Sequence, residues 1–215
     1  MALLNKYLYK HLYRMPPTLS IVIVFLYRKA TGKKLFMVRG LERSGTNYLC
    51  ALLRKRDYYA LNEFIKNESS YFHKHYRFGG VVNWRSAVLK ARYKSKGWQK
   101  YFDLILVKLM RIQTVYVIKD ERAWIESFSR HGLRFEWWDA SRLEVDKENM
   151  RDDYFLYLDK VRALTLNNPK SLIVSYDEVI DSADNRILSD FFLVKKFSKK
   201  DVVINTVPMS NEFTR

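Results

Sequence analysis

The chain has 215 residues, 48% of them hydrophobic, and only seven glycines and four prolines interrupt them. This composition is typical of a folded globular protein and excludes a disordered or collagen-like chain. The formal charge of +16 favours a polyanionic partner, such as a nucleotide, an acidic glycan, an anionic membrane surface or nucleic acid. Because Cys50 is the only cysteine, it has no partner within the chain for a disulfide, which favours a reducing compartment.

A basic segment over residues 1–34 precedes the expected core. Its apolar run, residues 19–27, is well short of the roughly 20 residues that a transmembrane helix needs. Lysine and arginine follow this run where a signal peptide would carry a cleavage site, so we expect no signal peptide. Residues 3–13 mix leucine and tyrosine with basic residues, which suits either an interfacial helix on an anionic membrane or a helix covering the core. We therefore expect a cytoplasmic protein that could associate with the inner membrane face.

Apolar runs of strand length organise the rest of the chain, and they cover residues 35–39, 114–118 and 171–175. Leucine and aromatic residues recur at helical spacing after each run, and further helical patterns cover residues 98–109 and 150–161. Strands that alternate with helices predict one three-layer α/β domain over residues 1–215, in which helices flank a parallel β-sheet. Ligands of such sheets gather at the carboxyl ends of the strands, where the polar turns at residues 40–45 and 119–122 are expected.

The turn after the first strand has the sequence GLERSGTN, from Gly40 to Asn47. Because it opens a helix, its backbone N–H groups and the helix dipole can hold a phosphate-like anion. A Walker A loop carries lysine and then serine or threonine where this turn has Thr46 and Asn47, which argues against an ordinary ATP or GTP phosphoryl-transfer enzyme. Arg43 supplies a fixed cation instead. Taken alone, the pattern is as often a helix cap as a ligand site.

This turn resembles the phosphosulfate loop of the sulfotransferase family, in which a basic residue is followed by Ser-Gly-Thr, and it is especially similar to bacterial-type members. The family's second signature is an arginine that ends a strand and a serine eight residues later, both binding the 3′-phosphate of the nucleotide. Lys119 and Ser127 occupy these positions here. The resemblance covers roughly residues 35–195 and includes the strand that ends in Tyr176-Asp177-Glu178.

The resemblance implies a P-loop-like fold and an enzyme that moves a sulfuryl group from 3′-phosphoadenosine 5′-phosphosulfate to a hydroxyl, on a carbohydrate or glycolipid. Adenosine 3′,5′-bisphosphate is then the product. The residues implied in nucleotide binding are Arg43, Ser44, Gly45, Thr46, Asn47, Lys119 and Ser127. Three tryptophans could stack on a sugar or belong to the core, namely Trp84, Trp137 and Trp138. We expect no metal and no specific nucleic acid.

The sequence departs from the family pattern in three places. Lys119 replaces the usual arginine, so bidentate recognition of the phosphate is lost and a point charge remains. Glu121 stands where a proline is common and places a carboxylate close to the nucleotide. The family's glycine-rich C-terminal loop is not evident, and residues 205–215 are the candidate substitute. We interpret Asp120 as a helix N-cap, and the aromatic residues of the following helix as core.

The acceptor hydroxyl needs a base, and the family places a catalytic histidine or carboxylate after the first helix. The candidates are His73 and His75, and we choose His75 because the Lys-His pair resembles bacterial-type members. Both could instead be solvated loop histidines. Glu63 is a reserve candidate, and we interpret His131 as a residue at a helix C-terminus that the helix dipole stabilises.

Two other classes of protein remain open. A non-catalytic basic protein that binds nucleic acid or an anionic membrane would also explain the charge of +16. A kinase with a degenerate phosphate loop would need ATP and magnesium.

Overall fold

The computed structural model describes residues 16–54, 58–63, 65, 72–75, 97–134, 143–166, 168–181 and 186–192. Within these residues, four strands form one sheet: β1 (Lys34–Gly40), β2 (Tyr58–Ala60), β3 (Gln113–Ile118) and β4 (Ser171–Ser175). Every pairing is parallel, and the order is β2-β1-β3-β4. The predicted strands are therefore confirmed as neighbours in one parallel sheet.

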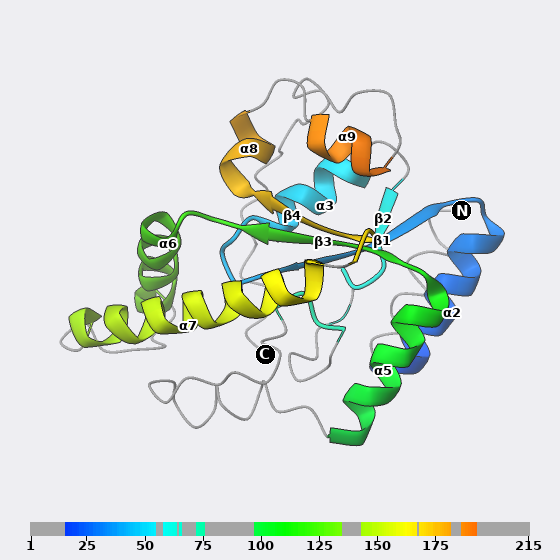
Figure 1. The fold of residues 1–215 in the computed structure, drawn as a ribbon, viewed down its shortest axis with the longest axis horizontal. Helices are drawn as coiled ribbons and strands as arrows, with labels where there is room; N and C mark the ends of the chain where they lie inside the picture. Colours follow the sequence, from blue (N-terminus) through cyan, green and yellow to red (C-terminus); the bar gives the residue numbers. More distant parts are fainter. Residues whose placement is uncertain are drawn as a thin grey trace.

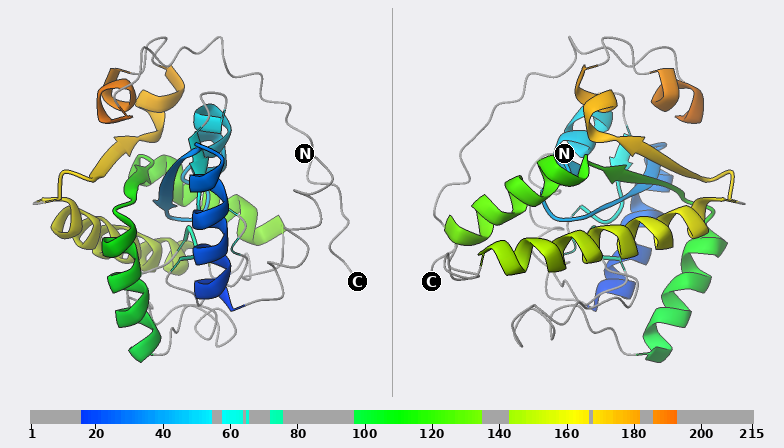
Figure 2. Two further views of the ribbon diagram at one scale, coloured as in Figure 1. Left: turned by 90° about the vertical axis from the view of Figure 1, so that its right-hand side faces the viewer. Right: turned by 60° about the vertical axis from the view of Figure 1, so that its left-hand side comes forward.

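Helices cover both faces of this sheet (Figures 1 and 2). The described helices are α2 (Pro17–Ala30), α3 (Thr46–Arg54), α5 (Gly97–Met110), α6 (Glu121–Arg134), α7 (Leu143–Thr165), α8 (Tyr176–Asp181) and α9 (Arg186–Phe192). In Figure 1, α3, α8 and α9 lie above the sheet, while α7 crosses below it. The predicted α/β architecture, with helices flanking a parallel sheet, is confirmed.

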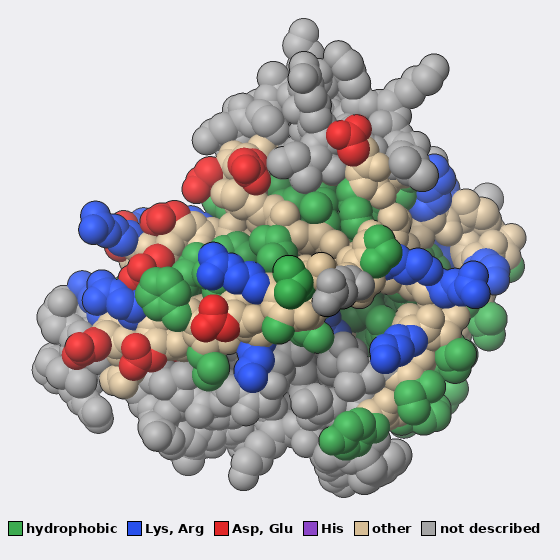
Figure 3. All heavy atoms as spheres, in the orientation of Figure 1, with side chains coloured by type: hydrophobic (Ala, Val, Ile, Leu, Met, Phe, Trp, Pro, Cys, Tyr) green, Lys and Arg blue, Asp and Glu red, His purple; other side chains and the backbone are tan. Residues whose placement is uncertain are grey.

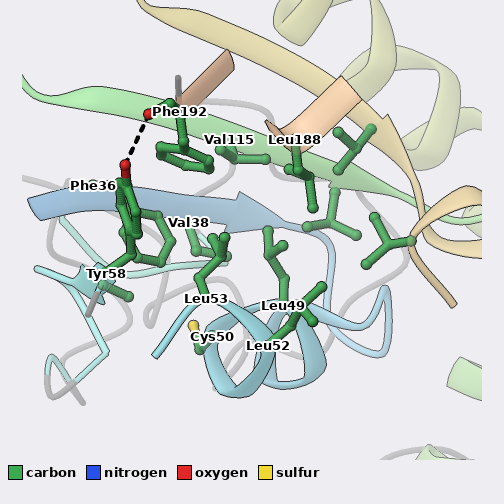
Figure 4. Close-up of a cluster of buried hydrophobic side chains, with 14 residues drawn as sticks. Phe36, Val38, Leu49, Cys50, Leu52, Leu53, Tyr58, Val115, Leu188 and Phe192 are labelled. Carbon is green, nitrogen blue, oxygen red and sulfur yellow. Dashed lines mark hydrogen bonds between the residues drawn. The ribbon is translucent and has the colours of Figure 1, made fainter. Parts of the chain in front are cut away.

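The strands distribute their side chains to the two faces by simple alternation. Phe36 and Val38 point to one face, where they join the cluster formed with α3, α8 and α9 (Figure 4). Met37 points to the other face and packs with α2 and α5. Tyr58 joins β2 to α9, because its hydroxyl donates a hydrogen bond of 2.8 Å to the carbonyl of Phe192. Both faces are thus apolar, as expected for a parallel sheet.

Cys50 lies inside this first cluster, on the buried side of α3. Burial raises the pKa of its thiol to about 12. The thiol therefore stays protonated and unreactive at neutral pH, as expected for a small apolar core residue.

Three elements differ from the sequence prediction or add to it. Strand β2 was not predicted, because three residues are too few for a period-two pattern to appear. Helix α8 begins directly at Tyr176, and its first turn is capped when Glu178 accepts a hydrogen bond of 3.1 Å from the Ser175 N–H. The apolar run at residues 19–27 lies within α2, a helix of 14 residues. Among the described residues, no helix has the length and apolarity that a membrane span requires.

Several predictions concern residues outside those that the structure describes. They are the interfacial helix at residues 3–13, the three tryptophans Trp84, Trp137 and Trp138, and the closing segment at residues 205–215.

Candidate functional site

The two predicted polar turns lie at the same edge of the sheet. Gly40 pairs with Val117, and Ile118 pairs with Ser175, so strands β1, β3 and β4 end together. The turn after β1, residues 41–45, and the turn after β3 are therefore neighbours at the carboxyl ends of adjacent strands. This is the edge where parallel sheets bind ligands.

The turn between β1 and α3 is strained and internally bonded. Arg43 and Gly45 both have positive φ angles, of 66° and 92°. Such a conformation costs free energy for a non-glycine residue like Arg43, and it persists only where the surroundings hold it. Ser44 is buried and directs both its N–H and its hydroxyl to the Leu41 carbonyl, at 3.2 and 2.7 Å. Ser44 thus closes the turn, while the side chain of Arg43 is exposed to solvent.

The ring of Tyr176 connects the turn to the second motif. A Cβ atom on Gly45 would overlap this ring, so only glycine fits beneath it. The ammonium of Lys119 lies 5.3 Å from the centre of the same ring, within the range of a cation–π interaction. Tyr176 is therefore in contact with both predicted nucleotide motifs. In the sequence, Tyr176 is marked only as part of the family pattern.

The amides that open α3 face this edge. The N–H groups of Gly45, Thr46 and Asn47 donate no hydrogen bond to any residue that the structure describes. The first N–H groups of a helix lack partners within the helix, and together with the dipole they attract an anion. The side chain of Thr46 is buried and that of Asn47 is exposed. No described group therefore competes for these amides with the anion that the sequence predicts there.

The candidate histidines lie directly beside the turn. The N–H of Gly40 donates to the Lys74 carbonyl at 3.0 Å, and Nδ1 of His75 lies 2.8 Å from the Gly40 carbonyl. A carbonyl oxygen can only accept, so Nδ1 of His75 carries the hydrogen. In the neutral ring Nε2 then holds the lone pair, which is the arrangement that a general base needs.

Lys74 brings a cation that sequence reasoning did not assign to the site. Its ammonium donates a hydrogen bond to Oδ1 of Asn47, in the first turn of α3. Burial lowers the pKa of this ammonium. The lysine that a Walker A loop would carry at position 46 is missing, but Lys74 reaches the same helix terminus from another segment. Its place between two candidate histidines was the only signal in the sequence.

His73 differs from His75 in its surroundings. His73 is buried, and burial together with the charges of His75, Lys74 and Arg39 lowers its pKa to about 3. Its Nδ1 accepts a hydrogen bond of 3.3 Å from the His75 N–H. His73 therefore holds the turn that carries His75 and stays neutral at physiological pH.

The second motif has the backbone positions that the sequence predicts. Asp120 caps α6, because its Oδ1 accepts a hydrogen bond of 3.1 Å from the Ala123 N–H. Glu121 turns toward α7, where it pairs with Arg151 at 2.6 Å, so this carboxylate is neutralised. The Tyr154 hydroxyl donates to the carbonyl of Lys119 at 2.8 Å and fixes the end of β3.

One side of α6 faces the turn after β1. Trp124 is fully buried, as predicted for a core residue, and its Nε1 donates to the Glu42 carbonyl at 2.7 Å. His131 lies in the last helical turn, and burial and the charge of Arg43 lower its pKa. The predicted dipole would raise that pKa, so burial and repulsion outweigh it. Ser127 lies between these two residues on the same side of α6, because positions three and four apart share one side. No hydrogen bond joins Ser127 to Lys119.

A cleft of about 480 Å³ adjoins the second motif. Ile118, Leu158 and Ile173 are its apolar lining residues, and the charged or polar ones are Lys119, Asp120, Tyr154, Arg162, Ser175, Asp177 and Glu178. The cleft therefore presents cations and carboxylates together, next to the predicted 3′-phosphate residue Lys119.

Glu63, the reserve base, lies toward the far end of α3. It forms an ion pair with Arg54, the last residue of α3, whereas the turn adjoins the first residue of that helix. Among the described residues, no group of histidine, cysteine and carboxylate side chains is placed to hold a metal ion.

Comparisons with protein-family models, with curated proteins and with solved structures found no match.

We predict that His73 makes the protein less stable as the pH falls. Its pKa is about 3 in the folded chain and near 6.5 when unfolded, so between these values the unfolded state binds more protons. The free energy of unfolding should therefore decrease as the pH is lowered through this range, by up to about 1.4 kcal/mol per pH unit for this group.

His73→Asn is the matched control, since the Asn amide oxygen replaces Nδ1 as acceptor but does not titrate. Urea unfolding between about pH 7 and about pH 5 should show a smaller pH slope in this variant. Equal slopes in the two proteins would contradict the assigned burial of a neutral His73.

Proposed function

We propose that this chain is a sulfotransferase that moves a sulfuryl group from 3′-phosphoadenosine 5′-phosphosulfate to a hydroxyl. The observation that carries the proposal is that the turn after β1 contacts the histidine turn and is linked through Tyr176 to the second nucleotide motif. His75 bonds to Gly40 at the start of the turn. The ring of Tyr176 packs on Gly45 at the end of the turn, and the ammonium of Lys119 lies over the same ring. The amides proposed to hold the anion thus lie at the same edge of the sheet as His75 and Lys119.

Nucleotide binding follows from the cations around this edge. The 5′-phosphosulfate would lie on the amides of residues 45–47, with Arg43 and Lys74 supplying positive charge on two sides. Lys119 would bind the 3′-phosphate as a point charge, beside the ring of Tyr176. Ser127 would add a hydroxyl from the side of α6 that faces the turn. The backbone of Ser44 shapes the turn for this anion.

The chemistry needs a base and stabilisation of charge. His75 takes the proton of the acceptor hydroxyl at Nε2, and the acceptor oxygen bonds to sulfur. The bond from sulfur to the bridging oxygen breaks, and adenosine 3′,5′-bisphosphate leaves with the electron pair. Arg43, Lys74 and the turn amides stabilise the charge that develops on the peripheral and bridging oxygens. No step of this scheme requires a metal.

The resemblance to bacterial-type members is what points to a carbohydrate or glycolipid as the acceptor. The buried, protonated thiol of Cys50 fits a reducing compartment, so we place the enzyme in the cytoplasm.

Replacing Lys119 and Ser127 together by alanine should weaken binding of adenosine 3′,5′-bisphosphate selectively. Each contact is charge-assisted, so the joint loss should reach about 2 kcal/mol or more. Binding of 5′-AMP, which lacks the 3′-phosphate, should change little. Calorimetry with both nucleotides measures the difference, and Lys170→Ala, at the opposite end of β4, controls for lost charge. Equal losses for the two nucleotides would remove both residues from the 3′-phosphate site.

His75→Ala should lower the rate of sulfuryl transfer about 10²- to 10⁴-fold, the usual contribution of a general base, with little change in nucleotide affinity. His73→Asn should retain most activity, because the assigned role of His73 is to hold the turn. Transfer of radiolabelled sulfate from the donor to a panel of sugar and lipid hydroxyls gives the rates. Near-normal transfer by His75→Ala, with loss in Glu63→Gln or His73→Asn, would refute the choice of base but leave the enzyme class standing.

A further inference from the structure

Among the residues that the structure describes, helices α2 and α5 carry large hydrophobic side chains that are exposed, at the other end of the strands from the turn after β1. Six of the exposed large hydrophobic residues lie on these two helices: Leu19, Leu26, Tyr101, Phe102, Ile105 and Leu109. We call this surface the α2–α5 face. The two helices lie side by side at the right of the molecule in Figure 1, and both turn toward the viewer in the left view of Figure 2. Apolar patches of this kind on a protein surface mark an interaction site.

The face arises because both helices are apolar on two sides. On α5, Leu106 and Met110 pack inward, whereas Ile105 and Leu109 lie four residues apart on the opposite side, and Leu109 is 74% exposed. On α2, Ile21 packs inward and is fully buried. The core therefore uses one side of each helix and leaves the other side for a partner.

Basic residues border the α2–α5 face, and its described residues include no exposed acidic side chain. Lys29 lies in the last turn of α2 and Lys34 begins β1, while Lys108 lies in the last turn of α5 and Arg111 follows that helix. All four side chains are exposed. Figure 3 shows basic side chains (blue) at the right, next to hydrophobic ones (green) along the lower right edge. The one acidic residue in residues 16–34 and 97–112 is Asp103, which is buried and accepts a hydrogen bond of 2.8 Å from Thr18.

We propose that the α2–α5 face docks on an anionic lipid bilayer. Leucine and aromatic side chains beside lysines and arginines are what an interfacial surface needs, since the apolar groups enter the acyl boundary and the cations meet the headgroups. A second copy of the chain fits less well, because a symmetric pair would bring the same basic border against itself. Each helix has 14 residues, about 21 Å, so these helices lie on the bilayer rather than cross it.

Docking on this face leaves the candidate site open. The two helices run into the amino ends of β1 and β3, whereas the turn lies at the carboxyl end of β1 (Figure 1). The bilayer and the nucleotide would therefore bind at opposite ends of the strands, and neither should block the other. The inference thus stands apart from the proposed function.

Flotation of the full chain with vesicles tests the proposal. We expect binding to vesicles of equal parts phosphatidylcholine and phosphatidylglycerol, weakening with salt, and little binding to phosphatidylcholine alone. The double variant Ile105→Glu, Leu109→Glu should bind at least about tenfold more weakly, because each carboxylate replaces an apolar contact and meets anionic lipid. Leu166→Glu is the matched control, since Leu166 is 81% exposed and lies after α7, outside the face.

Three results would overturn the proposal. One is that the wild-type chain does not bind the anionic vesicles, and another is that the double variant binds them as the wild type does, which would assign binding to another surface. The third is a wild-type dimer in sedimentation that the double variant loses, which would make the face a contact between copies. Circular dichroism and binding of adenosine 3′,5′-bisphosphate check the fold of each variant, and they report on the nucleotide site separately from the membrane.

Discussion

The backbone between Leu41 and Gly45 is held in a conformation that it would not keep alone, and the candidate site depends on it. The positive φ angle of Arg43 costs free energy, and contacts from three other segments maintain the turn. The histidine turn bonds to Gly40, the indole of Trp124 bonds to Glu42, and the ring of Tyr176 lies on Gly45. Because these contacts come from far along the chain, the shape of the turn is a property of the whole fold.

The same contacts gather positive charge around the turn. Lys74 comes with the histidine turn, Lys119 lies on the ring of Tyr176, and Arg43 projects from the turn itself. A loop without a Walker lysine thus obtains its cations from three separate segments. Such an arrangement suits a ligand with two separated anionic groups better than one with a single triphosphate bound to magnesium. Of the carboxylates near this charge, Glu121 is paired with Arg151, whereas Asp120, Asp177 and Glu178 line the cleft beside Lys119.

The sequence predicts those features that local pattern controls. Strand ends, the cap by Asp120 and the burial of Trp124 follow from periodicity and residue type, and the structure confirms them. The sequence does not predict features that depend on contacts between segments far apart in the chain. Lys74 has no motif of its own, and only the fold brings it to α3. The difference between His73 and His75 arises from burial and hydrogen bonding, which two residues so close in sequence do not reveal.

The central claim is that the turn binds a 3′-phosphorylated adenosine nucleotide, and a thermal-shift comparison tests it most directly. The wild-type chain is heated with adenosine 3′,5′-bisphosphate, with ATP and magnesium, or with a short oligonucleotide, at equal concentrations. We expect the bisphosphate to raise Tm most, because a ligand stabilises the folded state in proportion to its affinity for it. A larger shift with ATP and magnesium would instead indicate a degenerate kinase. A shift with the oligonucleotide alone would indicate a nucleic-acid-binding protein, and either result would contradict the account.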